Sequence, residues 1–180
     1  MSLDALMDGL PASARDIRTN YSQLVHNNHE LTAQQLWGTI VASAIATRSD
    51  VLTATVLDEA PRQLSEPALE AAQSAAALMG MTNIWYRFHH LASNPSYAAM
   101  PARLRMSAAH DHGVEDVDYE LWAMAVSAIN GCGKCVDAHE QAVLSKGVTE
   151  EVVAATVRLA AVMNAVGVVV DQLSAQAGHA

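Results

Sequence analysis

The sequence predicts a single all-α domain, and three observations support this. Half of its 180 residues are apolar but only 4% are aromatic, so the core must be built from small and flexible side chains. Alanine and methionine, both strong helix formers, are plentiful. Apolar residues recur at helical spacing, and no run alternates in the manner of a β-strand.

The first half of the chain predicts three helices. The first ends before Pro11 and has apolar residues at helical spacing: Leu3, Leu6, Met7 and Leu10. Thr32 has the character of an N-cap for a second helix, which carries Leu36, Ile40 and Ala44. Ser65, followed by Glu66 and Pro67, indicates the start of a third helix with an apolar stripe: Leu69, Ala72, Ala76 and Met79.

The second half predicts three more helices after a loop region. Residues 94–101 contain two prolines, and residues 111–118 contain Gly113 and four acids, so both are expected to be loops. An apolar helix is expected from near Asp118 to about Ile129, where Asn130-Gly131 breaks it. The next helix starts near Cys132 and ends at Gly147, and Thr149 caps the last one.

Shifting the sequence by 84 residues suggests an internal repeat, since Ser43-Ala44-Ile45 then matches Ser127-Ala128-Ile129. We therefore expect one domain over 1–180: a degenerate first repeat (1–93), a linker (94–117) and a second repeat (118–180) that carries the chemistry. At this offset Cys132, Cys135 and His139 match Arg48, Val51 and Thr55. Coincidence between two alanine-rich helical segments is the alternative.

Charge and hydropathy exclude several classes of function. The net charge of −9 disfavours nucleic acid and anionic membranes, which bind through lysine and arginine. The most apolar stretch, Leu159–Val170, is interrupted by Asn164 and is shorter than the roughly 20 residues of a membrane span. The N-terminus has acids where a signal peptide needs basic residues, so a cytoplasmic location is expected.

The two cysteines, Cys132 and Cys135, predict redox chemistry. A disulfide between residues three apart closes a very small loop and adds little stability, so the pair is more plausibly chemical than structural. Cysteine reacts as the thiolate, which the positive end of a helix dipole favours at Cys132. His139 lies one helical turn after Cys135, where an imidazole accepts a thiol proton.

Such a site suits the reduction of peroxides. Attack of a thiolate on a peroxide gives a sulfenic acid, which the neighbouring thiol converts to a disulfide. The sequence contains no glycine-rich nucleotide fingerprint for a flavin or nicotinamide. We therefore expect no bound cofactor, and a second protein or a dithiol as the reductant.

The residues around the cysteines resemble the alkylhydroperoxidase D family, within the wider carboxymuconolactone-decarboxylase-like group. The similarity covers most of the chain and rests on these residues and segments: Glu120, Trp122, Ala128-Ile-Asn-Gly-Cys132-x-x-Cys135-x-x-x-His139, Gly147, Leu36-Trp37-Gly38-Thr39 and Met79-Gly80-Met81-Thr82-Asn83.

The resemblance implies a helical fold with an internal repeat, assembled as a homotrimer. It implies that Cys135 is the peroxidatic thiol and the more buried of the two, and that Cys132 resolves the intermediate and meets the reductant. Glu120 would hold the imidazole of His139 in a proton relay. The implied reductant is the dihydrolipoamide of a 2-oxoacid dehydrogenase component, with a peroxiredoxin as a further redox partner. The resulting expectation is a thiol-dependent alkyl hydroperoxide reductase that serves antioxidant defence.

Lys134 departs from the family pattern, because the best-known members have a histidine of the relay at this position. Lysine does not shuttle protons near neutral pH, but its charge tunes a nearby thiol. Four alternatives stay open at this point. They are a zinc site made of Cys132, Cys135, His139 and Glu120, a disulfide reductase serving a peroxiredoxin, a decarboxylase of a γ-lactone acid, and a redox sensor without turnover. The decarboxylase needs no cysteine pair, and we expect no metal.

Overall fold

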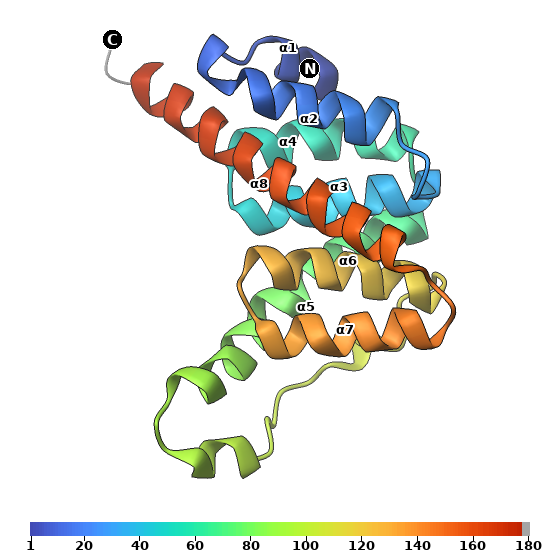
Figure 1. Cartoon of the computed structure of the whole chain (residues 1–180), viewed down its shortest axis with the longest axis vertical. Coiled ribbons are helices and arrows are strands. Elements are labelled where there is room, and N and C mark those ends of the chain that lie inside the picture. Colours follow the sequence, from blue (N-terminus) through green and yellow to red (C-terminus); the bar gives the residue numbers. More distant parts are fainter. Residues whose placement is uncertain (178–180) are drawn as a thin grey trace.

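The computed structural model describes residues 1–177 and confirms the all-α class: within these residues every regular element is a helix. Figure 1 shows the arrangement of the eight α-helices found in this part of the chain. They are α1 (Leu3–Asp8), α2 (Arg15–His26), α3 (Ala33–Thr47), α4 (Asp50–Glu59), α5 (Glu66–Leu91), α6 (Asp116–Ile129), α7 (Gly133–Ser145) and α8 (Glu150–Ala177). Four short 3₁₀ helices connect them: η1 (Ala12–Ala14), η2 (Ala60–Arg62), η3 (Pro95–Ala99) and η4 (Ser107–Ala109).

The expected helix starts are confirmed by their caps. Thr32 caps α3 in a capping box with Gln35, and the Ser65 hydroxyl accepts a hydrogen bond from the Ala68 N–H at the start of α5. Gly147 has a φ of +85° just after α7, which suits the residue that follows a helix end. Helix α6 begins at Asp116, two residues before the expected start, because Glu115 is already extended as its N-cap.

The centre of the core is the contact between α3 and α6. Trp122 of α6 is fully buried and lies over Gly38 of α3, where a Cβ atom would come within 2.1 Å of the indole ring. Glycine at this position therefore lets the two helices approach closely. Asp118 strengthens the same contact, because its carboxylate accepts hydrogen bonds from the side chains of Gln34 and Gln35 at 2.7 and 2.9 Å.

The helix bounds follow the 84-residue offset. Adding this offset to the bounds of α3, α4 and α5 gives those of α6, α7 and α8 to within two residues. The two sets of three helices thus share order and length. That the halves superpose as a structural repeat stays a prediction.

The C-terminal end of α5 and η3 project from the rest of the molecule (Figure 1). Several apolar side chains on this projection are exposed, among them Ile84 at 58% and Leu91 at 76%. The chain then returns through residues 101–106 to η4, which contacts α5 again. This return brings Met106 and Ala109 beside the cysteine region.

Helix α8 is long and apolar enough to cross a membrane by length and composition, with a mean hydropathy of 1.9 over its most apolar window. The helix continues past Asn164 to Ala177, so it is longer than the apolar stretch Leu159–Val170. The protein buries 44% of that window, and α8 packs against α2, α3, α4 and α6. A core helix passes the same test, so this composition is weak support for a membrane span.

Candidate active site

The cysteines lie at the link between α6 and α7, as the Asn-Gly break indicated. Asn130 ends α6, Gly131 takes a φ of +69°, and Cys132 is the N-cap residue of α7. Glycine adopts this left-handed backbone conformation readily, whereas a residue with a Cβ atom adopts it only at a cost in free energy. The Cys132 N–H donates to the Ser127 carbonyl at 3.0 Å, which folds the link back onto α6.

The sulfurs of Cys132 and Cys135 form a disulfide in the structure, across a Cα–Cα distance of 5.3 Å. Both residues are buried, but Cys132 is 0% exposed and Cys135 is 6% exposed. The expectation that Cys135 is the more buried is therefore wrong. The physical reason is position: Cys132 is enclosed where the link folds against α6, whereas Cys135 lies in the first turn of α7 and lines a cavity.

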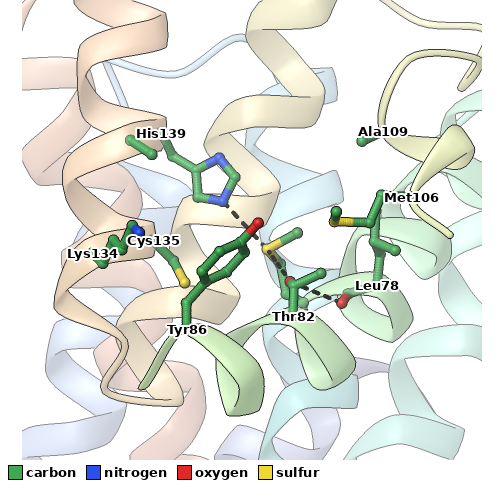
Figure 2. Close-up of a pocket in the computed structure, with 10 residues that line it drawn as sticks. Leu78, Thr82, Tyr86, Met106, Ala109, Lys134, Cys135 and His139 are labelled. Carbon is green, nitrogen blue, oxygen red and sulfur yellow. Dashed lines mark hydrogen bonds between the residues drawn. The ribbon is translucent and has the colours of Figure 1, made fainter. Parts of the chain in front are cut away.

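This cavity has a volume of about 360 Å³ and is bounded by α5, α7 and the segment around η4 (Figure 2). Its walls are mostly apolar, and Cys135 and His139 contribute its reactive groups. The lining residues are Leu78, Met79, Thr82, Tyr86, Met106, Ala109, Lys134, Cys135, Ala138 and His139. Cys132 is not part of the lining, so the cavity faces one sulfur of the pair.

Glu120 and His139 form a close pair across α6 and α7. The Glu120 carboxylate lies 2.6 Å from Nδ1 of His139, and both side chains are largely buried. Because an ionised carboxylate only accepts, Nδ1 donates its proton to this bond. In the neutral ring the basic nitrogen is then Nε2, on the opposite side of the imidazole from Glu120.

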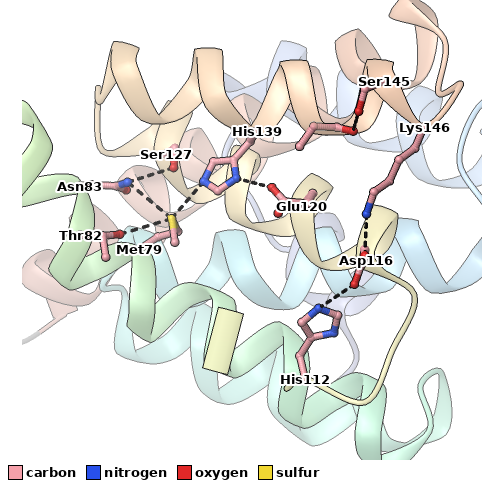
Figure 3. A network of polar contacts seen from close by, with 11 residues as sticks. Met79, Thr82, Asn83, His112, Asp116, Glu120, Ser127, His139, Ser145 and Lys146 are labelled. Atoms are coloured by element: carbon pink, nitrogen blue, oxygen red, sulfur yellow. Dashed lines mark hydrogen bonds and ion pairs between the residues drawn. The ribbon is translucent and has the colours of Figure 1, made fainter. Parts of the chain in front are cut away.

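The second contact of His139 is one that sequence reasoning missed. Its Nε2 lies 3.3 Å from the sulfur of Met79 on α5 (Figure 3). In this disulfide form the two ring nitrogens contact Glu120 and Met79, and the imidazole makes no hydrogen bond to Cys135. Cys135 and His139 nevertheless line the same cavity, as their spacing of four residues on one helix indicated.

A chain of amides and hydroxyls connects α5 to the cysteine link. Asn130 donates to the side-chain oxygen of Asn83, and Asn83 donates to the Ser127 hydroxyl, both at 3.0 Å. The Arg87 guanidinium donates to the Asn130 carbonyl at 2.5 Å. The link that carries Cys132 is thus fixed by α5 as well as by its own backbone bonds.

The residues that reasoning from sequence missed share a face of α5. Met79, Asn83 and Tyr86 follow one another at spacings of four and three, and all three reach toward α6 or α7. That spacing was the available signal. It was ambiguous, because Met79 alone belongs equally well to an ordinary core stripe.

Lys134 is exposed, and its ammonium group lies over the ring of Tyr86, 5.1 Å from the ring centre. This is a cation–π contact. In the part of the chain that the structure describes, no three histidine, cysteine or acidic residues are grouped so as to hold a metal ion. The sulfurs that a zinc site would use are bonded to each other in this form.

Comparison with known proteins gives the family. Residues 95–177 match the model of the carboxymuconolactone decarboxylase family. A protein of Acidobacterium capsulatum named alkyl hydroperoxide reductase AhpD is 61% identical over 95% of this chain and 93% of its own length. The chain belongs to the AhpD family. Proteins of the same name from Koribacter versatilis and a Methylobacterium strain are 52% and 50% identical, over 95% and 98% of this chain and 88% and 100% of theirs.

Membership in the AhpD family confirms the family resemblance read from the cysteine motif and makes the chain an oxidoreductase. The comparison does not assign roles to single residues. The individual roles of these residues stay predictions: Cys132, Cys135, His139, Glu120 and Lys134.

Proposed function

We propose that this protein reduces alkyl hydroperoxides through a dithiol–disulfide cycle of Cys135 and Cys132. One observation carries the proposal. Cys135 faces an apolar cavity that also contains an imidazole oriented by a carboxylate, and its sulfur is within bonding distance of a second cysteine. Three relatives over nearly the whole chain bear the name alkyl hydroperoxide reductase.

In the first step the Cys135 thiol gives its proton to Nε2 of His139, and the thiolate attacks the terminal oxygen of the hydroperoxide. The O–O bond breaks and an S–O bond forms, so that sulfur is oxidised to a sulfenic acid. The alkoxide leaves with the electron pair and takes the proton from His139, which gives the alcohol. The thiol of Cys132 then attacks the sulfenic sulfur, and one water is released as the disulfide forms.

Glu120 supports the imidazole in this cycle. Its carboxylate fixes the tautomer with Nε2 unprotonated and stabilises the imidazolium that forms when Cys135 gives up its proton. The sulfur of Met79 at 3.3 Å is a weak acceptor for the Nε2–H of that imidazolium. In this proposal Cys135 is the peroxidatic thiol, Cys132 resolves, and Lys134 tunes the thiols by its charge.

We propose a dihydrolipoamide arm of a 2-oxoacid dehydrogenase component as the reductant, and a peroxiredoxin as a further redox partner. The support is chemical: the sequence lacks a nucleotide fingerprint, and a dithiol reopens a disulfide by exchange without any bound cofactor. A homotrimer in the cytoplasm completes the proposal. The exposed apolar residues Ile84 and Leu91 suit a surface that another subunit covers.

The test is steady-state reduction of an organic hydroperoxide with a dihydrolipoamide-recycling system. The variants are Cys135→Ser and Cys132→Ser, and the matched control is Val51→Ser, which makes a serine at the position of the first half that corresponds to Cys135. Wild type and Val51→Ser are expected to turn over, whereas both cysteine variants lose turnover. Full activity in Cys135→Ser would refute the proposal. A wild type that forms the disulfide but reduces no hydroperoxide would indicate the disulfide reductase.

A further inference from the structure

Two of the polar side chains that line the cavity, Thr82 and His139, are occupied by contacts within the protein. The Thr82 hydroxyl donates to the Leu78 carbonyl at 3.0 Å. The two nitrogens of His139 face Glu120 and Met79. The Tyr86 hydroxyl is different, because within residues 1–177 it has no hydrogen-bond partner although its side chain lines the cavity. Figure 2 shows the ring of Tyr86 extending from α5 into the space beside Cys135.

We propose that Tyr86 donates a hydrogen bond to the departing oxygen of the hydroperoxide, which makes it a further catalytic residue. This inference rests on the proposed function. Three points of geometry support it: Tyr86 shares the cavity with Cys135 and His139, its hydroxyl is available to a ligand, and its ring has a defined position. The ammonium of Lys134 lies over that ring, and His89 contacts it edge-on at 6.0 Å between ring centres.

The chemistry needs such a donor. When the Cys135 thiolate breaks the O–O bond, negative charge develops on the oxygen that leaves as alkoxide. A hydrogen bond aimed at that oxygen stabilises the transition state more than the ground state. The proton that completes the alcohol is still the one that His139 took from Cys135, so Tyr86 keeps its own proton and no further reactant is needed.

Lys134 is the rival donor, since its ammonium is also next to the cavity. It differs from Tyr86 in two respects. Its side chain is exposed, and its charge lies over the ring face. We therefore assign the hydrogen bond to the peroxide to the Tyr86 hydroxyl. Lys134 positions the ring of Tyr86 through its cation–π contact.

The experiment measures the single-turnover rate of the reduced protein with two oxidants of different leaving group, tert-butyl hydroperoxide and peracetic acid. Tyr86→Phe keeps the ring and removes only the hydroxyl. We expect a loss of about 100- to 1,000-fold with tert-butyl hydroperoxide, the range for removal of one donor to a developing oxyanion. With peracetic acid the loss is expected to be much smaller, because carboxylate is a good leaving group. Tyr97→Phe, on η3 and outside the cavity lining, is the matched control.

The rate of alkylation of Cys135 by iodoacetamide is measured in the same proteins. An unchanged alkylation rate in Tyr86→Phe, together with the leaving-group-dependent loss, supports the proposal. Equal losses with both oxidants, a parallel fall in alkylation, or no loss would overturn it. The same leaving-group pattern in Lys134→Met but not in Tyr86→Phe would assign the donor to Lys134 instead. If wild type is inert toward both oxidants, the proposed function itself fails.

Discussion

The two sets of three helices differ in the links between their first two members. Between α3 and α4, Arg48 takes a φ of 64° and Ser49 caps α4. The Ser49 hydroxyl also donates a hydrogen bond to a carboxylate oxygen of Asp171 at 2.5 Å. This bond connects the link to α8. Between α6 and α7 the link is one residue longer, and a cysteine replaces serine as the cap.

The side chains around the two links differ as well. At the offset of 84 residues, Leu36 corresponds to Glu120 and Thr55 to His139, so the first half has neither the carboxylate nor the imidazole. The two halves share the order and approximate length of their helices. In the proposed function, the chemistry depends on a few side chains of the second half. Substitutions at matched positions in the two halves distinguish effects on the fold from effects on the reaction.

The largest effect is expected from His139→Asn. Loss of a general base costs about 10²- to 10⁴-fold, so peroxide reduction near pH 7 should fall by that amount. The loss should shrink as the pH rises above about 8.5, where a thiol ionises without help. Thr55→Val, at the matching position of the first half, should leave the rate unchanged. Comparison of pH–rate profiles checks this, and a wild-type profile in His139→Asn would contradict it.

A smaller loss is expected from Glu120→Gln, which keeps the size of the side chain and removes its charge. A hydrogen bond to a charged group is worth about 1.5–3 kcal/mol, which corresponds to about a 10- to 150-fold fall in rate. Glu140→Gln makes the same change on α7 away from the imidazole and serves as the control. Equal rates for the two variants would remove Glu120 from the relay.

The contact between the halves is tested by Gly38→Ala. The added Cβ would meet the rigid indole of Trp122 at 2.1 Å, and such overpacking costs about 1–3 kcal/mol of unfolding free energy. Gly80→Ala in α5 is the control. It meets nothing within 4 Å and should stabilise the helix by about 0.5–1 kcal/mol. Urea unfolding at one protein concentration measures both, and similar midpoints would contradict the close α3–α6 contact.

The smallest effect on stability and activity is expected from Lys146→Ala, which removes an ion pair between the end of α7 and the start of α6. A hydrogen bond from Lys146, followed by its charge, lowers the pKa of Asp116 below the ordinary 3.8. Because the pKa of Asp116 is lower in the folded protein, the contact with Lys146 stabilises the folded state above pH 3.8. This stabilisation is lost as the pH falls through the folded pKa. Lys146→Ala should raise this pKa with little effect on activity, since the pair is exposed. An NMR titration that shows an unmoved Asp116 would contradict this.

Much of the frame was predictable from local chemistry. Thr32 and Ser65 cap the helices they were expected to cap, and Asn130-Gly131 ends α6, because caps and left-handed turns depend on a few adjacent residues. Helix α8 likewise begins at Glu150, directly after the Thr149 that was expected to cap it.

The site was predictable only in part. The spacing of Cys132, Cys135 and His139 along one helix is local and was correctly placed. The contacts from Met79 and Tyr86 depend on how α5 packs against α7, and no local pattern encodes that packing. The relative burial of the cysteines was wrong for the same reason, since it depends on how the link folds against α6.

The proposed function requires Cys132 and Cys135 to work together as a two-electron dithiol toward hydroperoxides. The most direct measurement is a single turnover of the fully reduced protein with one equivalent of organic hydroperoxide in the absence of any reductant. The account predicts that one alcohol forms for every two thiols lost, and that peptide mapping finds the disulfide between Cys132 and Cys135. Peroxide that stays unreduced, or is reduced while both thiols remain free, would contradict it.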